Sequence, residues 1–150
     1  MFSEEGRPVV LLADDNPQDV LLAQRAFKKA SVDCSLAVVT DGDDAVAYLA
    51  GTGKYGDRKV HPLPVLMLLD IKMPRRSGLD VLQWSRAQPH LKQLTMVMLT
   101  SSNESEDVKK AYELGANSFL VKPVAFSDLL EMVKALQIYW LTLNQRPHLC

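Results

Sequence analysis

Cysteine is scarce in this sequence, and an excess of either charge is missing. The 150 residues include two cysteines, Cys34 and Cys150, which lie far apart along the chain. This usage is typical of free thiols in a reducing compartment rather than of a disulfide framework. Lys and Arg together number 17 and Asp and Glu 18, so the chain lacks the basic excess with which proteins bind nucleic acid.

Long apolar runs are also missing. The longest apolar stretch falls short of the ~20 residues that cross a membrane. The opening residues MFSEEGRP lack the basic start and apolar stretch of a signal peptide. The histidines His61, His90 and His148 show no metal-ligand spacing. We therefore expect a cytoplasmic protein with neither a membrane nor nucleic acid as a partner.

The composition is sufficient for a folded core. Hydrophobic residues make up 47% of the chain and charged residues 23%, which is typical of one globular domain that folds without disulfides. We expect a tail over residues 1–7, a single domain over 8–143 and a second tail over 144–150.

Short apolar runs alternate with longer helical patterns along the chain. The expected strands are 9–13, 36–40, 64–70, 94–100 and 117–121, and the expected helices are 17–30, 43–51, 77–88, 104–115 and 126–143. Five consecutive strand–helix units predict an α/β fold, a doubly wound five-stranded parallel sheet with five helices. The strands are apolar throughout, as expected where helices cover both faces of a sheet. The stretch 52–64 is rich in Gly, Pro and charge and predicts an enlarged surface loop.

Polar residues stand where four of the five expected strands end. Asp14 and Asp15 follow the first strand, and Asp70 ends the third. Thr100 ends the fourth strand, and Lys122 follows the fifth. Taken singly, each has an ordinary explanation as a helix cap, a turn former or a solvated charge. Because ligands bind at the carboxyl ends of the strands in such sheets, we expect these five side chains to meet.

Three carboxylates at one edge of a sheet repel one another. At ~4 Å each pair costs about 4 kcal/mol at an effective dielectric constant of 20, and a raised pKa or a bound cation relieves that cost. Oxygen ligands suit Mg²⁺, which also binds phosphate oxygens. A carboxylate can then accept a phosphoryl group. In that case Lys122 offsets the phosphoryl charge and Thr100 donates a hydrogen bond to it.

These residues together resemble the receiver domain of response regulators in two-component signalling, the CheY-like family. The resemblance covers about residues 8–136 and rests on the pair Asp14-Asp15, Asp70 in LLDIKMPRRSG, Thr100 in VMLTSS and Lys122 in FLVKP. It implies a flavodoxin-like sheet with the strand order 2-1-3-4-5.

The resemblance also implies a role for each residue of the site. Asp70 is expected to be the phosphoacceptor, and Thr100 and Lys122 are expected to hold the phosphoryl oxygens. The expected Mg²⁺ ligands are Asp14, Asp15, Asp70 and the backbone carbonyl of Lys72.

Two further expectations come with the family. Phe119 takes the place of the aromatic switch residue, which turns inward as Thr100 moves toward the phosphate. The Lys122–Pro123 peptide bond is expected to be cis. This form costs much less before proline than before any other residue.

A narrower resemblance concerns the small single-domain receivers that are paired with bacterial phytochrome histidine kinases. It rests on the opening LLADDNPQDVLLAQRAFKKA, the loop 52–64 and the segment KPVAFSDL. It implies a phytochrome-type sensor kinase as the phosphodonor.

Only NQRPHLC follows Leu143. We therefore expect a stand-alone response regulator that signals by protein–protein interaction and is not an enzyme with a separate substrate.

The last expected helix carries more apolar residues than its own sheet can cover. The surplus lies around Ile138 to Leu143. We expect Tyr139, Trp140 and Leu143 to form a homodimer surface. Packing back onto the domain is the alternative.

Three other classes of protein share parts of this pattern. A flavodoxin-like FMN carrier needs a phosphate loop rich in glycine and hydroxyl groups after the first strand, where this chain has DDNPQD. A phosphohydrolase of the haloacid-dehalogenase type has a second Asp two residues after its nucleophile, where this chain has Lys72. An inert binding module that works without phosphorylation is the remaining rival, and failure to bind Mg²⁺ would favour it.

Overall fold

The structure, a computed structural model, describes residues 1–3, 6–147 and 149. Cys34 is buried and has a free thiol, as its sequence context predicted. The expectations for Cys150 and His148 lie outside the described residues.

Five parallel strands form one sheet in the order β2-β1-β3-β4-β5. They are β1 (Val9–Ala13), β2 (Ser35–Val39), β3 (Leu66–Leu69), β4 (Met96–Thr100) and β5 (Ser118–Val121). The predicted fold class and strand order are therefore confirmed. The three inner strands are buried along their whole length, which agrees with their apolar sequences.

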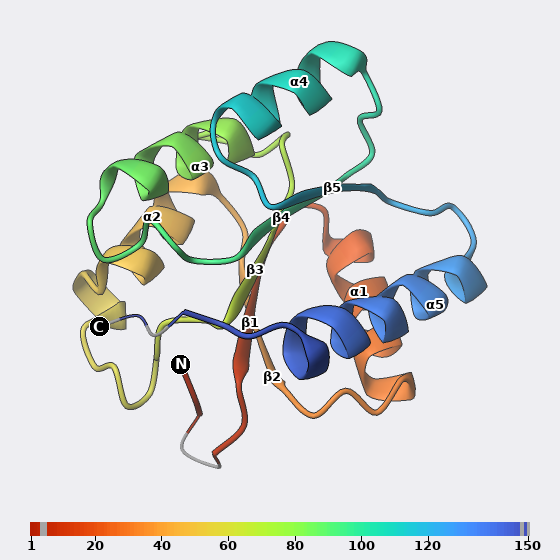
Figure 1. Cartoon of the computed structure of the whole chain (residues 1–150), viewed down its shortest axis with the longest axis horizontal. Helices are drawn as coiled ribbons and strands as arrows, with labels where there is room; N and C mark the ends of the chain where they lie inside the picture. The colour runs from red at the N-terminus through yellow and green to blue at the C-terminus, as the bar shows by residue number, and fades with distance from the viewer. Residues whose placement is uncertain (4–5, 148, 150) are drawn as a thin grey trace.

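Helices cover both faces of the sheet (Figure 1). They are α1 (Pro17–Lys29), α2 (Gly42–Ala50), α3 (Gly78–Ala87), α4 (Ser105–Glu113) and α5 (Phe126–Leu136). Helices α1 and α5 pack together on one face, and α2, α3 and α4 lie on the other. Successive strand side chains point to opposite faces, so Leu11 joins the core cluster of Leu82 in α3, and Leu12 joins that of Val133 in α5. Among the described residues, no helix is long and apolar enough to span a bilayer.

Local signals place the helix ends close to where the sequence predicts them. The Asn16 side chain accepts hydrogen bonds from the backbone N–H groups of Gln18 and Asp19 at the start of α1, which satisfies two unpaired helix donors. Gly51 ends α2 with a φ of 71°, a left-handed conformation that a residue without Cβ adopts at little cost.

The last helix changes its geometry halfway along. The α-helical part ends at Leu136, and a π-helical segment, η2 (Gln137–Leu143), continues it. The predicted range 126–143 is thus helical to its end, and its last seven residues are π-helical. The π-helix has an i→i+5 hydrogen-bond pattern and frequently occurs at functional sites.

The loop 52–64 lies largely at the surface, as predicted, but part of it packs against α2. It contains a short 3₁₀-helix, η1 (Gly53–Tyr55), and the Tyr55 ring is buried 4.9 Å from the Tyr48 ring and 5.0 Å from the His61 ring. The Arg58 guanidinium donates hydrogen bonds to the carbonyls of Tyr48 and Leu49 at the end of α2. The loop therefore caps a helix, a function that its Gly- and charge-rich composition does not reveal.

Candidate functional site

Three carboxylates meet at the carboxyl ends of two neighbouring strands, β1 and β3. One oxygen atom of each of Asp14, Asp15 and Asp70 lies within 4.8 Å of the others. Backbone hydrogen bonds fix two of these positions, because the Asp14 N–H donates to Val39 and the Asp70 N–H donates to Ala13, each over 3.0 Å. The predicted convergence of these three residues is confirmed.

The carboxylates differ in their exposure. Asp14 and Asp70 are 1% and 7% exposed, whereas Asp15 faces solvent. Burial raises the pKa of the Asp14 carboxyl above its ordinary value, and the hydrogen bond from Lys122 opposes that shift. A set of close oxygen donors, two of them buried, fits a hard divalent cation.

Lys122 projects into the carboxylates from the end of β5. Its Nζ lies 2.6 Å from an oxygen of Asp14, 2.9 Å from one of Asp19 and 3.0 Å from one of Asp70. Burial disfavours the ammonium, but these hydrogen bonds and charges outweigh it and raise the pKa of Lys122 above its ordinary value. Lys122 therefore stays charged at neutral pH, and its single charge is surrounded by an excess of carboxylates.

Asp19 is a member of this site that the sequence analysis missed. It lies in the first turn of α1, one helical turn beyond the Asn16 cap. An acidic residue there is common simply because it interacts favourably with the helix dipole. No local signal distinguishes that ordinary role from contact with a lysine 103 positions further along the chain.

Thr100 is buried at the end of β4, beside Lys122. Its carbonyl accepts a hydrogen bond of 2.8 Å from the Lys122 N–H, and its Oγ1 accepts one of 3.3 Å from the Ser102 N–H. The sheet register thus brings the predicted hydroxyl and ammonium to adjacent strand ends.

The segment after Asp70 turns sharply away from the site. Gly78 begins α3 against the Asp70 backbone, and its N–H donates to the Ile71 carbonyl over 2.8 Å. Arg75 has a positive φ of 70°, and its side chain pairs with Asp41 at 3.3 Å. Neighbouring Arg76 pairs with Asp43 of α2 at 2.9 Å, so both arginines hold the turn against α2.

The expectation of a cis bond before Pro123 is wrong in this structure. No peptide bond among the described residues is cis, so Lys122–Pro123 is trans, the form that the X–Pro bond itself prefers. The bond between the Lys122 N–H and the Thr100 carbonyl already directs the lysine into the site.

The remaining predicted residues lie outside the carboxylate cluster. Phe119 is half-buried in β5 and packs against the core cluster beneath α3 and α4. Lys72 is exposed in the turn after β3. Tyr139, Trp140 and Leu143 lie in η2, away from the ends of β1 and β3. Their predicted roles in switching, metal ligation and dimerisation stay predictions.

A parallel sheet in this order, with an acidic cluster and a largely buried lysine at its carboxyl edge, is typical of the receiver class of signalling domains. The family model of the response regulator receiver domain matches residues 10–134. The chain therefore belongs to that family and is a receiver of two-component signalling. Receivers bind a divalent metal, which agrees with the donor set, and membership implies a histidine kinase as partner.

Two of the proteins that this chain resembles are response regulators of similar length. Response regulator Rcp1 of Synechocystis sp. is 36% identical over 142 residues, which cover 93% of this chain and 95% of Rcp1. The phosphorylated cyanobacterial phytochrome response regulator RcpA superposes with a TM-score of 0.87 at 31% identity over 95% of this chain and 99% of RcpA.

Two further solved structures of response regulators have the same fold as this chain. Response regulator RPA3017, described in red light signalling of R. palustris, has a TM-score of 0.89 at 32% identity over 94% of this chain and 99% of its own. A Mn²⁺-bound form of Rcp1 has a TM-score of 0.85 at 35% identity over 94% of this chain and 99% of that one. The chain is thus homologous to phytochrome response regulators.

Proposed function

We propose that this chain is a stand-alone, cytoplasmic response regulator that accepts a phosphoryl group on Asp70 from a histidine kinase. The observation that supports this most directly is the position of Asp70. Its carboxylate lies within 4.8 Å of oxygens of Asp14 and Asp15 and 3.0 Å from the ammonium of Lys122. The protein then acts through its modified state and does not turn over a separate substrate.

Mg²⁺ is the cation that the proposal assigns to the carboxylates. Asp14, Asp15 and Asp70, with the backbone carbonyl of Lys72, would hold it. When bound, it neutralises the carboxylates and the charge on the transferring phosphoryl group.

The transfer itself needs one nucleophile and one leaving group. A carboxylate oxygen of Asp70 attacks the phosphorus, and the bond from phosphorus to the donor nitrogen of phosphohistidine breaks. The imidazole leaves with the electron pair and takes up a proton. Lys122 and Thr100 then donate hydrogen bonds to the phosphoryl oxygens.

Thr100 and Phe119 are the residues that would transmit the change. Thr100 ends β4, and Phe119 pairs with Met98 of the same strand across the β4–β5 ladder. A movement of Thr100 toward the phosphoryl group would therefore act directly on the strand that carries Phe119.

Intact mass spectrometry tests the chemistry. The protein and its Asp70→Asn variant are incubated with acetyl phosphate and Mg²⁺. We expect one phosphoryl group on the wild type and none on the variant. A folded wild type that takes up no phosphoryl group would refute the proposal and favour a constitutive binding module.

A phytochrome-type histidine kinase is the proposed donor. The homology to RcpA and Rcp1 over nearly the whole chain supports this assignment. Purified bacterial phytochrome kinase, phosphorylated with labelled ATP, should transfer its label within minutes to the wild type and not to Asp70→Asn. Faster transfer from a kinase without a photosensory domain would argue against the assignment.

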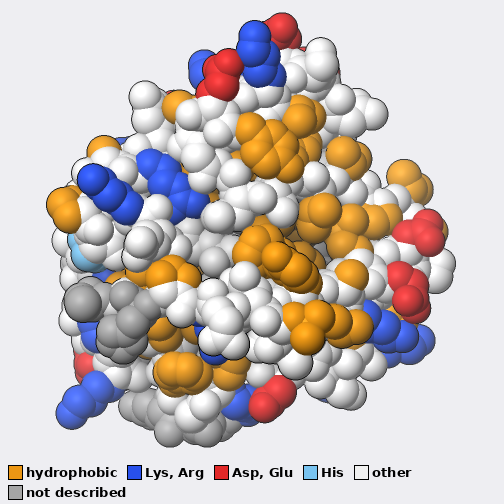
Figure 2. All heavy atoms as spheres, in the orientation of Figure 1, with side chains coloured by type: hydrophobic (Ala, Val, Ile, Leu, Met, Phe, Trp, Pro, Cys, Tyr) orange, Lys and Arg blue, Asp and Glu red, His pale blue; other side chains and the backbone are white. Residues whose placement is uncertain are grey.

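The last helix supports a homodimer as the second part of the proposal. Ile138, Tyr139 and Leu143 are 57%, 53% and 64% exposed, and Figure 2 shows apolar side chains gathered over the face formed by β5 and α5. Exposed apolar side chains that gather on one face, rather than lying scattered, are typical of an interaction site.

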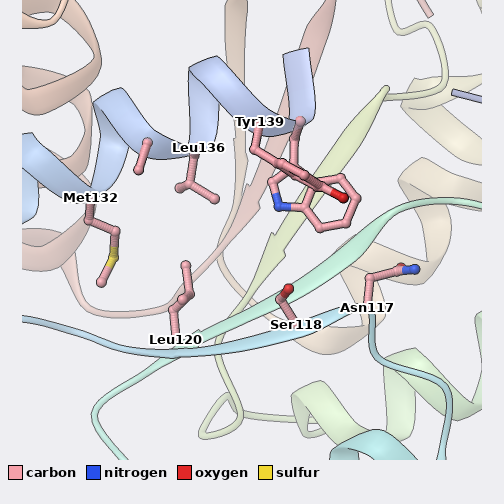
Figure 3. Close-up of a pocket in the computed structure, with 8 residues that line it drawn as sticks. Asn117, Ser118, Leu120, Met132, Leu136 and Tyr139 are labelled. Carbon is pink, nitrogen blue, oxygen red and sulfur yellow. The ribbon is translucent and has the colours of Figure 1, made fainter. Parts of the chain in front are cut away.

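A groove runs between this helix and the edge strand β5. It has a volume of about 370 Å³ and is lined by Asn117, Ser118, Leu120, Met132, Ala135, Leu136, Tyr139 and Trp140. Figure 3 shows Tyr139 and Leu136 on the helical side facing Ser118 and Leu120 of β5. The Tyr139 and Trp140 rings meet edge to face, 4.8 Å apart. A second copy could place its own apolar helix residues here in a symmetric arrangement.

Two exposed leucines provide a matched test of the dimer. Leu143→Ser in η2 should shift the protein toward monomer in sedimentation velocity, whereas Leu21→Ser in α1, 47% exposed in the wild type, should not. A wild type that sediments as a monomer with and without phosphorylation would exclude this interface.

A further inference from the structure

The ammonium of Lys122 uses its whole donor capacity on carboxylates. A lysine ammonium has three N–H donors, and Asp14, Asp19 and Asp70 each accept one at 3.0 Å or less. The Lys122 side chain is only 12% exposed. It follows that Lys122 can donate to a phosphoryl oxygen only by giving up one of these three partners.

The three partners are not equivalent. Asp14 and Asp70 belong to the group of carboxylates that can hold a metal ion, and Asp19 does not. The carboxyl group of Asp70 also loses its negative charge when one of its oxygens is bonded to phosphorus in the acyl phosphate. Asp19 neither belongs to the metal-holding group nor accepts the phosphoryl group, so its carboxylate stays available to Lys122 throughout the reaction.

We propose that Asp19 is a positioning residue for phosphoryl transfer, the constant anchor that keeps the Lys122 ammonium directed at Asp70. This inference rests on the proposed role of Asp70 as phosphoacceptor. Asp19 touches neither the phosphoryl group nor the reacting oxygen, and it acts through Lys122.

The local structure suits an anchor. The Asp19 N–H donates to the Asn16 side chain over 3.1 Å, so the capped first turn of α1 fixes the backbone from which the carboxylate projects. At the other end of the lysine, its backbone N–H is bonded to Thr100 over 2.8 Å. Lys122 is therefore held at both ends, by β4 at its backbone and by α1 at its ammonium.

An ordinary role for Asp19 at the start of a helix makes a different prediction. Asp128 occupies the same third position of α5 and also lies in the first turn of its helix. If Asp19 serves only the dipole of its helix, then Asp19→Ala and Asp128→Ala should have similar effects. Asp128→Ala is thus a matched control for the change in charge and in helix stability.

The first measurement is the rate of phosphorylation by acetyl phosphate over a range of Mg²⁺ concentrations. At saturating Mg²⁺, the rate constant should fall roughly tenfold in Asp19→Ala and stay within about twofold of wild type in Asp128→Ala. Asp19→Asn, which keeps an oxygen acceptor, should lie between them. If Asp19 mattered only through its negative charge, Asp19→Ala would instead raise the Mg²⁺ concentration for half-maximal rate and leave the saturated rate unchanged.

The second measurement needs no phosphorylation. With ¹⁵N-labelled lysine, the ordered Lys122 ammonium should give a slowly exchanging NMR signal in the wild type and in Asp128→Ala, and Asp19→Ala should lose it. If Asp19→Ala retains the signal and has the saturated rate of the wild type, the proposed role of Asp19 is overturned, but the proposed function is not. A wild type that takes no phosphoryl group would overturn the proposed function and this role together.

Discussion

Gly78 allows the chain to pass directly against the residue that carries the candidate phosphoacceptor. A Cβ atom at position 78 would lie 1.9 Å from the carbonyl oxygen of Asp70 and 2.8 Å from its carbonyl carbon. Both are backbone atoms of a buried strand end, so they cannot move aside without moving Asp70. Packing at this one residue and the position of the carboxylate are therefore coupled.

We expect Gly78→Ala to lower both stability and phosphorylation. The forced backbone shift should cost about 3 kcal/mol, and displacement of Asp70 should slow phosphorylation by acetyl phosphate at least roughly tenfold. Urea unfolding and intact mass measure the two effects. The control is Gly56→Ala, where the nearest atom would be 3.5 Å away. Equal behaviour of the two variants would contradict the coupling.

Cys34 should be an unreactive thiol at neutral pH. Burial, with a smaller effect of Asp33, raises the pKa of Cys34 to about 11, so roughly one thiol in a thousand is ionised at pH 8. The folded pKa lies above the ordinary value of 9.0. The stability that this shift contributes is therefore complete below pH 9 and is lost as the pH rises toward 11.

The reaction of Cys34 with a thiol reagent measures this directly. In a Cys150→Ser background, native protein should react far more slowly at pH 8 than urea-unfolded protein, and its rate should climb steeply between pH 9 and 11. If the native and unfolded rates are equal at pH 8, the thiol is not protected as described.

The residues of the site differ in how far sequence alone reveals them. Asp14, Asp15 and Asp70 could be predicted to meet because each stands at a strand end, and the topology of a parallel sheet brings strand ends together. Asp19 could not, because its contact with Lys122 joins the first turn of α1 to a residue 103 positions further along the chain. The isomer at Pro123 could not either, since the two forms differ by only about 0.5–1 kcal/mol for such a bond.

At the scale of elements, Arg86 joins three segments through one side chain. It projects from the last turn of α3. The guanidinium donates to the carbonyls of Gly115, Leu91, Lys92 and Leu94 and to the side-chain oxygen of Asn117. These acceptors lie in the connections before β4 and β5. One planar cation with five donors replaces several separate caps.

Replacing Arg86 by Met should destabilise the fold by about 3 kcal/mol, because several partly buried carbonyls would lose a charged donor. Arg86→Lys should recover only part of the loss, since an ammonium cannot span the same acceptors. Chemical denaturation measures both. A loss below about 1 kcal/mol for Arg86→Met would show that water satisfies these carbonyls equally well.

Element boundaries were predictable where a local rule decides them. The Asn16 cap and Gly51 mark helix ends through the chemistry of a single residue. The change to a π-helix after Leu136 and the packed loop 52–64 have no such local rule. The arrangement of the loop depends on contacts with α2, such as those of Tyr55 with Asp44 and of Arg58 with Leu49.

At the scale of the whole molecule, the site stores electrostatic energy that opposes folding. Asp14, Asp15 and Asp70 are held within 4.8 Å of one another, and Lys122 neutralises only one of their charges while it also serves Asp19. In the unfolded chain these charges separate. We therefore expect this repulsion to lower the stability of the metal-free fold, and a bound cation to restore the difference.

The variant Asp15→Asn separates the repulsion among the carboxylates from the stabilisation by a bound cation. Asp15 is the exposed member of the cluster, so the substitution relieves repulsion without leaving a buried group unpaired. Without metal, we expect the variant to melt roughly 2–4 °C above the wild type, equivalent to ~1 kcal/mol for a domain of this size. Asp128→Asn, which changes the net charge equally, should leave the melting temperature unchanged.

Addition of Mg²⁺ should reverse this order. A cation at one hundred times its dissociation constant stabilises the fold by about 2.7 kcal/mol, and the wild type, with three carboxylates, gains that in full. Asp15→Asn binds the cation more weakly and gains little, so its melting curve should fall below that of the wild type, and excess chelator should restore the original order. If Mg²⁺ raised the melting temperatures of both proteins equally, the cation would bind elsewhere. The acidic cluster would then no longer support the proposed phosphorylation of Asp70.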